Sequence, residues 1–162
     1  MKNLPSELYH FTSRKHIPCI LKMGKLLPSS SEVFPPDEAT TRIVKHPFID
    51  DVFVVKDKNS DFKTVVWLTK DKDGNAHGNG LENVNPNCPY EHNEFRITFK
   101  FKQSFQPWHK FSIANGMPKW WRKCIEYGRC PFNWYVHEGE LSIDGTTIHR
   151  RVNGEWVIFK DF

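Results

Sequence analysis

The stretch from Leu8 to Gly24 constrains the fold more than any other part of this sequence. Residues 8–13 have the composition of a short buried strand, and they carry one imidazole and two hydroxyl groups near its end. His10 and Thr12 fall on one face of that strand because strand side chains alternate. A core strand with one hydrogen-bonded histidine explains the pattern, and so does a strand that presents His10 to a ligand.

A helix is expected directly after this strand. Ser13 can cap it, and Gly24 is suited to the position just past its C-terminal end. The inward positions at helical spacing are Ile17, Ile20 and Leu21. Pro18 lies too deep for a helix capped at Ser13, so either the helix starts nearer His16 or its first turn is irregular.

Further along, Thr64–Thr69 is apolar enough for a central strand, and Val52–Lys56 suits a short edge strand. Glu94–Phe101 alternates strictly, with its four apolar residues on one face. Pro118 and Gly128 bracket a further helix. Its expected inward residues are Trp121, Cys124 and Ile125.

The C-terminal third predicts three strands: residues 133–143, 146–152 and 155–159. Asp144-Gly145 and Asn153-Gly154 separate them, and both dipeptides suit two-residue hairpin turns. We therefore expect a three-stranded antiparallel meander. The whole pattern predicts one α+β domain over residues 1–162 with a mainly antiparallel sheet. It has no βαβ rhythm, GxGxxG or Walker-type loop, which argues against a Rossmann or P-loop nucleotide site.

The composition limits the ligands and the cellular location that we expect for this protein. The net charge of +4 is compatible with an anionic ligand, and the aromatic content of 14% serves core packing or stacking on bases. No signal-like or membrane-length apolar run is present, which predicts a cytoplasmic protein with no membrane partner. The four cysteines lack CxxC spacing, so neither Cys88 with His92 nor Cys124 with Cys130 predicts a metal site.

Two carboxylates stand out on the first of the C-terminal strands. Glu138 and Glu140 share a strand face with Trp134 and Val136. Carboxylates beside apolar residues are costly unless they are solvated or used. The solvent face of an antiparallel sheet explains them as well as a functional site does.

Three motifs in this order resemble the ADP-ribosyltransferase-like superfamily. Tyr9-His10-Phe11-Thr12-Ser13 resembles its first motif strand, Val65-Val66-Trp67-Leu68-Thr69 is similar to its second, and Glu138-Gly139-Glu140 is similar to its Glu-x-Glu. The Tyr-His-x-Thr form is also similar to DNA-targeting ADP-ribosyltransferase toxins and, more distantly, to RNA 2′-phosphotransferases. The resemblance implies a split, mainly antiparallel sheet that binds NAD⁺ as a substrate.

The implied reaction transfers ADP-ribose from NAD⁺ to a protein or nucleic-acid acceptor, or hydrolyses NAD⁺, through an oxocarbenium-like step. The implied catalytic residues are His10, Glu140 and Glu138, with Glu140 as the preferred carboxylate. The implied contacts to NAD⁺ are Tyr9, His10, Thr12, Trp67 and Thr69. Arg42 is a further candidate, as a pyrophosphate contact, since a guanidinium suits phosphate oxygens. No step needs a metal.

Three alternatives stay open from the sequence. Asn93-Glu94-Phe95-Arg96 resembles the Glu-bearing strand of the DNA-targeting toxins, so Glu94 competes for the carboxylate role. An RNA 2′-phosphotransferase would use the same scaffold with more basic residues around the pocket. A non-catalytic module would bind nucleotides or nucleic acid through stacking aromatic residues.

Overall fold

The structure is a computed structural model, which describes residues 3–30, 41–45, 52–56, 63–74, 93–126 and 129–160. The strands and helices of the first half are β1 (Glu7–Thr12), α1 (Ile17–Met23), β2 (Lys25–Leu26), β3 (Ser29–Ser30), β4 (Thr41–Lys45), β5 (Val52–Lys56) and β6 (Thr64–Thr69). Those of the second half are β7 (Phe95–Lys100), β8 (Gln106–Pro107), α2 (Trp108–Ala114), α3 (Lys119–Glu126), the 3-10 helix η1 (Pro131–Asn133), β9 (Trp134–Glu138), β10 (Leu141–Ser142), β11 (Thr147–Val152) and β12 (Glu155–Ile158). The expected α+β class with a mainly antiparallel sheet is confirmed.

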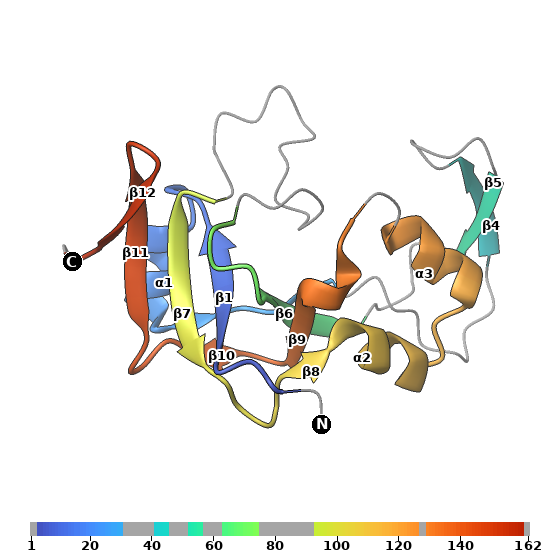
Figure 1. Ribbon diagram of the computed structural model, residues 1–162. Coiled ribbons are helices and arrows are strands. Elements are labelled where there is room, and N and C mark those ends of the chain that lie inside the picture. The colour runs from blue at the N-terminus through green and yellow to red at the C-terminus, as the bar shows by residue number, and fades with distance from the viewer. Residues whose placement is uncertain are drawn as a thin grey trace.

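One antiparallel sheet organises the molecule (Figure 1). Its strand order is β12-β11-β7-β1-β6-β9-β8, and β3 also pairs with β6. Separate two-stranded sheets are formed by β10 with β2 and by β4 with β5. The central position predicted for residues 64–69 is confirmed, because β6 has partners on both edges.

The sheet buries side chains on both faces, because alternate residues of β6 and β9 belong to different clusters. Val66, Leu68 and Tyr135 pack in the larger cluster, together with α1 through Ile17 and Ile20. The smaller cluster lies on the opposite face of β6 and β9. It contains Val65, Trp108, Phe111, Met117, Trp134 and Val136, with Trp67 packed against it. Helix α2 covers this second face with its own aromatic side chains.

The start of α1 settles the question that Pro18 raised. The helix begins at Ile17, so Pro18 lies in its first turn, where a missing N–H costs nothing. Ser13 is not a side-chain cap. Its carbonyl accepts from the backbone N–H groups of His16 and Ile17, each at 3.1 Å, and forms a turn before the helix. Gly24 ends α1 with φ of 68°, as expected.

The predicted C-terminal meander is wrong in its first strand. Residues 133–143 do not form one strand, because Gly139 takes φ of 80° and ends β9. Beyond that turn β10 pairs with β2, whereas β9 pairs with β6 and β8. The second hairpin is confirmed, since β11 and β12 pair across Asn153-Gly154. Asp144-Gly145 forms a turn that leads into β11 without joining paired strands.

Two further differences concern helices. Helix α2 begins directly after Pro107, where the sequence pattern predicted no helix, and its buried residues Trp108 and Phe111 anchor it to the sheet. Helix α3 lies where Pro118 and Gly128 predicted a helix. Its expected inward side chains, Trp121, Cys124 and Ile125, fall outside what the structure describes. No helix in the described part of the chain is both long and apolar enough to cross a membrane.

Candidate functional site

An interruption in backbone pairing marks the centre of the sheet. β1 pairs with β6 at Tyr9 and Thr69, and β3 pairs with the same strand at Val65 and Thr64. Between these pairings, residues 66–68 have no strand partner on that edge among the residues that the structure describes. We call residues 66–68 the unpaired β6 edge. This is where β1 diverges from β6, beside His10.

His10 reaches the unpaired β6 edge with its ring. Its Nδ1 lies 2.9 Å from the carbonyl oxygen of Trp67. A carbonyl oxygen only accepts hydrogen bonds, so Nδ1 carries the proton and Nε2 presents a lone pair. Desolvation lowers the pKa of His10, and the nearby His16 acts in the same direction, while the Trp67 carbonyl opposes them. The ring is therefore neutral at pH 7, with an acceptor at Nε2.

The other residues of the first motif are divided between the two faces of β1. Thr12 is buried and shares the face of His10. Tyr9 lies on the opposite face, where its hydroxyl donates to Glu7 at 3.1 Å. Burial and this bond raise the pKa of Tyr9, and the guanidinium of Arg96 lies 5.5 Å from its ring centre. Tyr9 and His10 thus belong to different surroundings.

The side chains of Trp67 and Thr69 in the second motif make structural contacts within the fold. The Trp67 ring lies 4.9 Å from Trp108 and 5.8 Å from Trp134, measured between ring centres. It is half-buried among them on the α2 face. The Thr69 hydroxyl accepts from the backbone N–H of Asp71 at 3.1 Å and closes the turn after β6. What Trp67 places at the unpaired β6 edge is its backbone carbonyl, which His10 binds.

The two carboxylates of the third motif have different surroundings. Glu138 is exposed at the end of β9, opposite Val65 of β6, and its carboxylate has no ion pair with the described residues. Glu140 lies past the turn, where its carboxylate pairs with Lys25 at 2.7 Å in an exposed bridge. Its carbonyl lies 3.2 Å from His137 Nε2. Both glutamates lie at or just after the end of β9, which pairs with β6 on the edge opposite β1 and His10.

Arg42 is not brought to these strands by backbone pairing. It lies on β4, opposite Val55 of β5, in a two-stranded sheet separate from the large one. Its side chain lies outside what the structure describes.

Glu94 has the most enclosed carboxylate of the candidates, with 7% of its side chain exposed. Its Oε2 accepts from Arg14 Nε at 2.9 Å and from the Arg14 backbone N–H at 3.3 Å. Its Oε1 accepts from Arg150 at 3.5 Å. The sequence did not indicate either arginine as a site residue. Their contact with Glu94 becomes visible only once the pairing of the strands is known. This cluster neutralises Glu94 and ties the ends of β1, β7 and β11 together.

A second arginine cluster covers the Tyr9 face. Arg96 lies over Trp156 at 4.8 Å, and Arg151 lies over the same ring at 4.5 Å. Arg96 also donates to the carbonyl of Lys72 at 2.6 Å, and Arg151 donates to that of Asp73. These bonds hold the segment after β6 against the sheet. The sequence did point to Arg96, because the alternation of residues 94–101 places it on the polar face of β7, away from the core.

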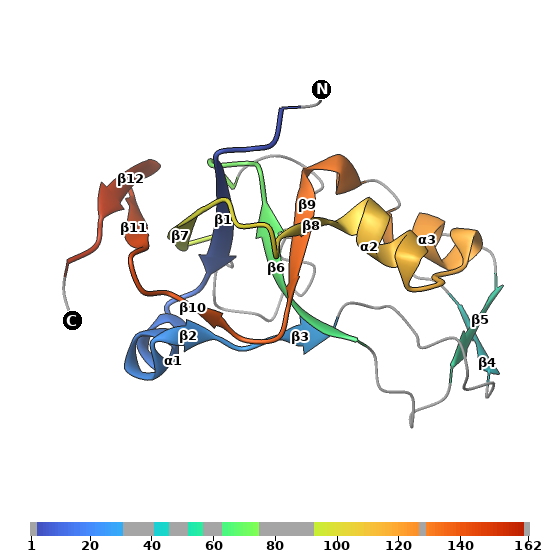
Figure 2. The same ribbon diagram turned by 90° about the horizontal axis from the view of Figure 1, so that it is seen from below.

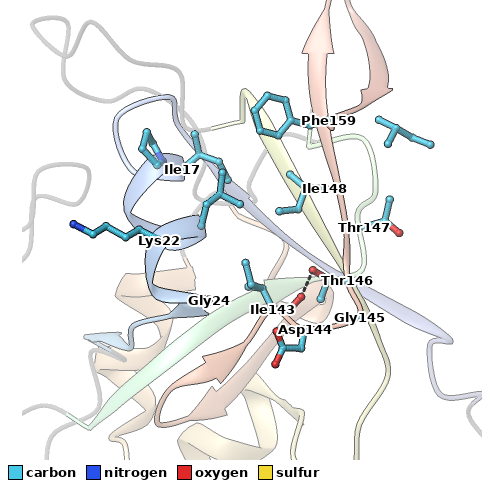
Figure 3. Close-up of a pocket in the computed structure, with 13 residues that line it drawn as sticks. Ile17, Lys22, Gly24, Ile143, Asp144, Gly145, Thr146, Thr147, Ile148 and Phe159 are labelled. Carbon is cyan, nitrogen blue, oxygen red and sulfur yellow. Dashed lines mark hydrogen bonds between the residues drawn. The ribbon is translucent and has the colours of Figure 1, made fainter. Parts of the chain in front are cut away.

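The cavity of about 910 Å³ shown in Figure 3 lies elsewhere. It is bounded by α1, the turn before β11 and the chain after β12. Its wall is largely aliphatic, and the ammonium of Lys22 points away from it. No candidate residue of the three motifs lines it. Among the described residues no three His, Cys, Asp or Glu side chains are grouped to hold a metal ion.

Comparisons with protein-family models, with curated proteins and with solved structures each find no match to this chain.

Proposed function

We propose that this protein cleaves the nicotinamide–ribose bond of NAD⁺ and transfers ADP-ribose to a protein or nucleic-acid acceptor, or to water. The observation that carries the proposal is the order β1-β6-β9 in the sheet. The first two motifs lie on β1 and β6, and the third begins at Glu138, the last residue of β9, although more than fifty residues separate each motif from the next in sequence.

His10 supports the proposal through its protonation state. A neutral ring with Nδ1–H fixed on the Trp67 carbonyl offers Nε2 as an acceptor for a ribose hydroxyl. The lowered pKa keeps that acceptor available at neutral pH. His10 then orients the ribose and takes no proton in the reaction.

The bond-breaking step needs a carboxylate. The C1″–N bond breaks, its electron pair leaves with nicotinamide, and C1″ gains positive charge that a nearby carboxylate stabilises. The acceptor oxygen or water then bonds to C1″ and loses its proton to a base. We assign the carboxylate role to Glu138, because the Lys25 ammonium already neutralises Glu140 and two guanidiniums neutralise Glu94. Strand register places Glu138 on the Tyr9 face of the sheet, so NAD⁺ must span the unpaired β6 edge to contact both His10 and Glu138.

The test measures nicotinamide release from NAD⁺ labelled in the nicotinamide ring, alone and with protein, DNA or RNA acceptors. His10→Asn keeps a donor near the Nδ1 position and removes the Nε2 acceptor, so the fold is retained. We expect it to lower kcat/KM about tenfold, the effect of one lost hydrogen bond. His137→Asn, on a half-buried histidine of β9, is the matched control and should keep full activity.

The carboxylates are compared in the same assay. Glu138→Gln should lower kcat by about 10² or more, as loss of transition-state electrostatic stabilisation does. Glu140→Gln should have a smaller effect. Loss of activity in Glu140→Gln with Glu138→Gln unaffected would reverse the assignment. Absence of NAD⁺ binding and turnover with every acceptor class would refute the proposed function.

A further inference from the structure

Basic charge is concentrated in one segment of this chain. Residues 108–130, which include α2 and α3, hold five of the 23 basic residues and one of the 19 acidic residues. The remainder of the chain has 18 of each sign and is neutral overall. The net charge of +4 therefore belongs entirely to this segment, whose helices α2 and α3 lie at the end of the molecule away from β11 and β12 (Figures 1 and 2).

The basic side chains of this segment are available to a ligand. Its single acid, Glu126, lies 3.8 Å from Arg122 within α3. The remaining four basic residues are exposed, and none makes an ion pair with the described residues. They are Lys110, Lys119, Lys123 and Arg129. We call these four the basic group. Lys119 and Lys123 are four residues apart on α3 and so lie on one helix face.

Exposed apolar side chains occur within this segment and in η1, which follows it. Phe132 is 80% exposed, Ile113 is 52% exposed and Trp120 is 44% exposed. In α2 the principal apolar face is already used, since Trp108 and Phe111 are fully buried against the sheet. Among the described side chains of this segment and η1, the large apolar ones that remain exposed are two separate aromatic residues and one isoleucine. A helix that lies on a membrane needs a continuous apolar face, whereas single-stranded nucleic acid is bound by cations with isolated stacking rings.

We propose that the α2–α3 end binds single-stranded nucleic acid, with the basic group on the phosphates and Phe132 stacked on a base. The surface adjoins the candidate site through the sheet, because α2 packs on the face that contains Trp67, Trp134 and Val136. The inference does not rest on NAD⁺ chemistry. Binding is measured without NAD⁺, so the two proposals fail independently.

The test is fluorescence anisotropy of labelled 20-nucleotide poly-dT and poly-U strands with the full chain. Three or four phosphate contacts predict a slope of log K against log salt of about −2 to −3. The affinity should then fall about 20- to 50-fold between 50 and 200 mM salt. The paired substitution Lys119→Gln with Lys123→Gln should reduce the slope by about 1.4. Phe132→Ala should weaken binding at least fivefold and leave the slope unchanged.

The matched control removes two exposed lysines outside the basic group, Lys22→Gln with Lys160→Gln, for the same change in net charge. It should leave binding within twofold. Equal weakening by both pairs would mean that only overall charge matters, and would overturn the assigned surface. No binding at 50 mM salt would overturn it as well. So would preference for vesicles of phosphatidylserine and phosphatidylcholine over both strands, which would assign the surface to a membrane.

Discussion

Replacing Glu94 by glutamine tests how the ends of three strands are held together. The carboxylate accepts three hydrogen bonds, two from Arg14 and one from Arg150. An amide of the same shape has only one acceptor oxygen. Glu94→Gln therefore loses either the Arg150 bond or both Arg14 bonds, and it turns an N–H group toward a guanidinium.

The expected cost is intermediate between that of a buried ion pair and that of an exposed one. A hydrogen bond to a charged group contributes about 1.5–3 kcal/mol when buried, and an exposed pair contributes about 0.2–1 kcal/mol. Glu94 is 7% exposed, but Arg14 is 64% and Arg150 is 49% exposed, so solvent screens the cationic half. Glutamine also avoids the desolvation of a charge. We expect a loss of about 1–2 kcal/mol, or roughly 2–8 °C in Tm for a domain of this size.

Urea unfolding followed by circular dichroism measures this change, and an unchanged m value would show that the two states are otherwise the same. Glu140→Gln is the matched control, because it removes one carboxylate from an exposed pair with Lys25. It should cost less than about 0.5 kcal/mol. Equal effects of the two substitutions would refute the inference that burial makes the Glu94 cluster stabilising.

Two further predictions concern backbone strain and pH. Gly74→Ala should cost about 2–4 kcal/mol in urea unfolding, since φ is 65° and the new Cβ would lie 2.7 Å from the Phe11 ring. Gly139→Ala, with φ of 80° and no atom of the described residues within 4 Å of the new Cβ, should cost about 1–2 kcal/mol, and equal losses would show that the Phe11 contact is unimportant. The pKa of His10 is lower in the folded state than in the unfolded state, so as the pH falls below 6.5 the unfolded state takes up the His10 proton more readily. The free energy of unfolding therefore decreases as the pH falls. His10→Asn removes this titration, so thermal melts at pH 7 and pH 5 should differ less than in the wild type, and an unchanged difference would contradict the assigned His10 titration.

Local periodicity accounts for the parts of the fold that the sequence predicted. Val65, Val66 and Leu68 are buried, as expected for a central strand. In β7 the alternation of Phe95 and Ile97 with polar residues also appears in the burial pattern. Both signals depend on near neighbours in sequence. The choice of strand partner does not, which is why β10, bound to β2 across more than 110 residues, was wrongly placed in a meander.

The candidate site shows the same limit. Alternation correctly put His10 and Thr12 on one face of β1. It could not reveal that the Trp67 ring packs against Trp108, because α2 was not predicted. Nor could it reveal the Glu94 cluster, since Arg14 meets Glu94 only through the register of β1 with β7. Such contacts come from tertiary packing, which no local pattern specifies.

The interruption beside β6 gives His10 a structural role as well as its proposed one. A backbone carbonyl left unsatisfied in a partly buried site costs about 1–3 kcal/mol, and the His10 ring satisfies the one at Trp67. His10→Ala would therefore lower both stability and activity, even if the ring never contacted a substrate. His10→Asn can retain the bond to Trp67 while removing Nε2, and His10→Gln can place an acceptor near Nε2 without that bond. Catalytic loss in a folded Asn variant, with partial recovery in the less stable Gln variant, would be the signature of a ribose acceptor. Loss that follows stability alone would leave His10 as the group that closes the edge of the sheet.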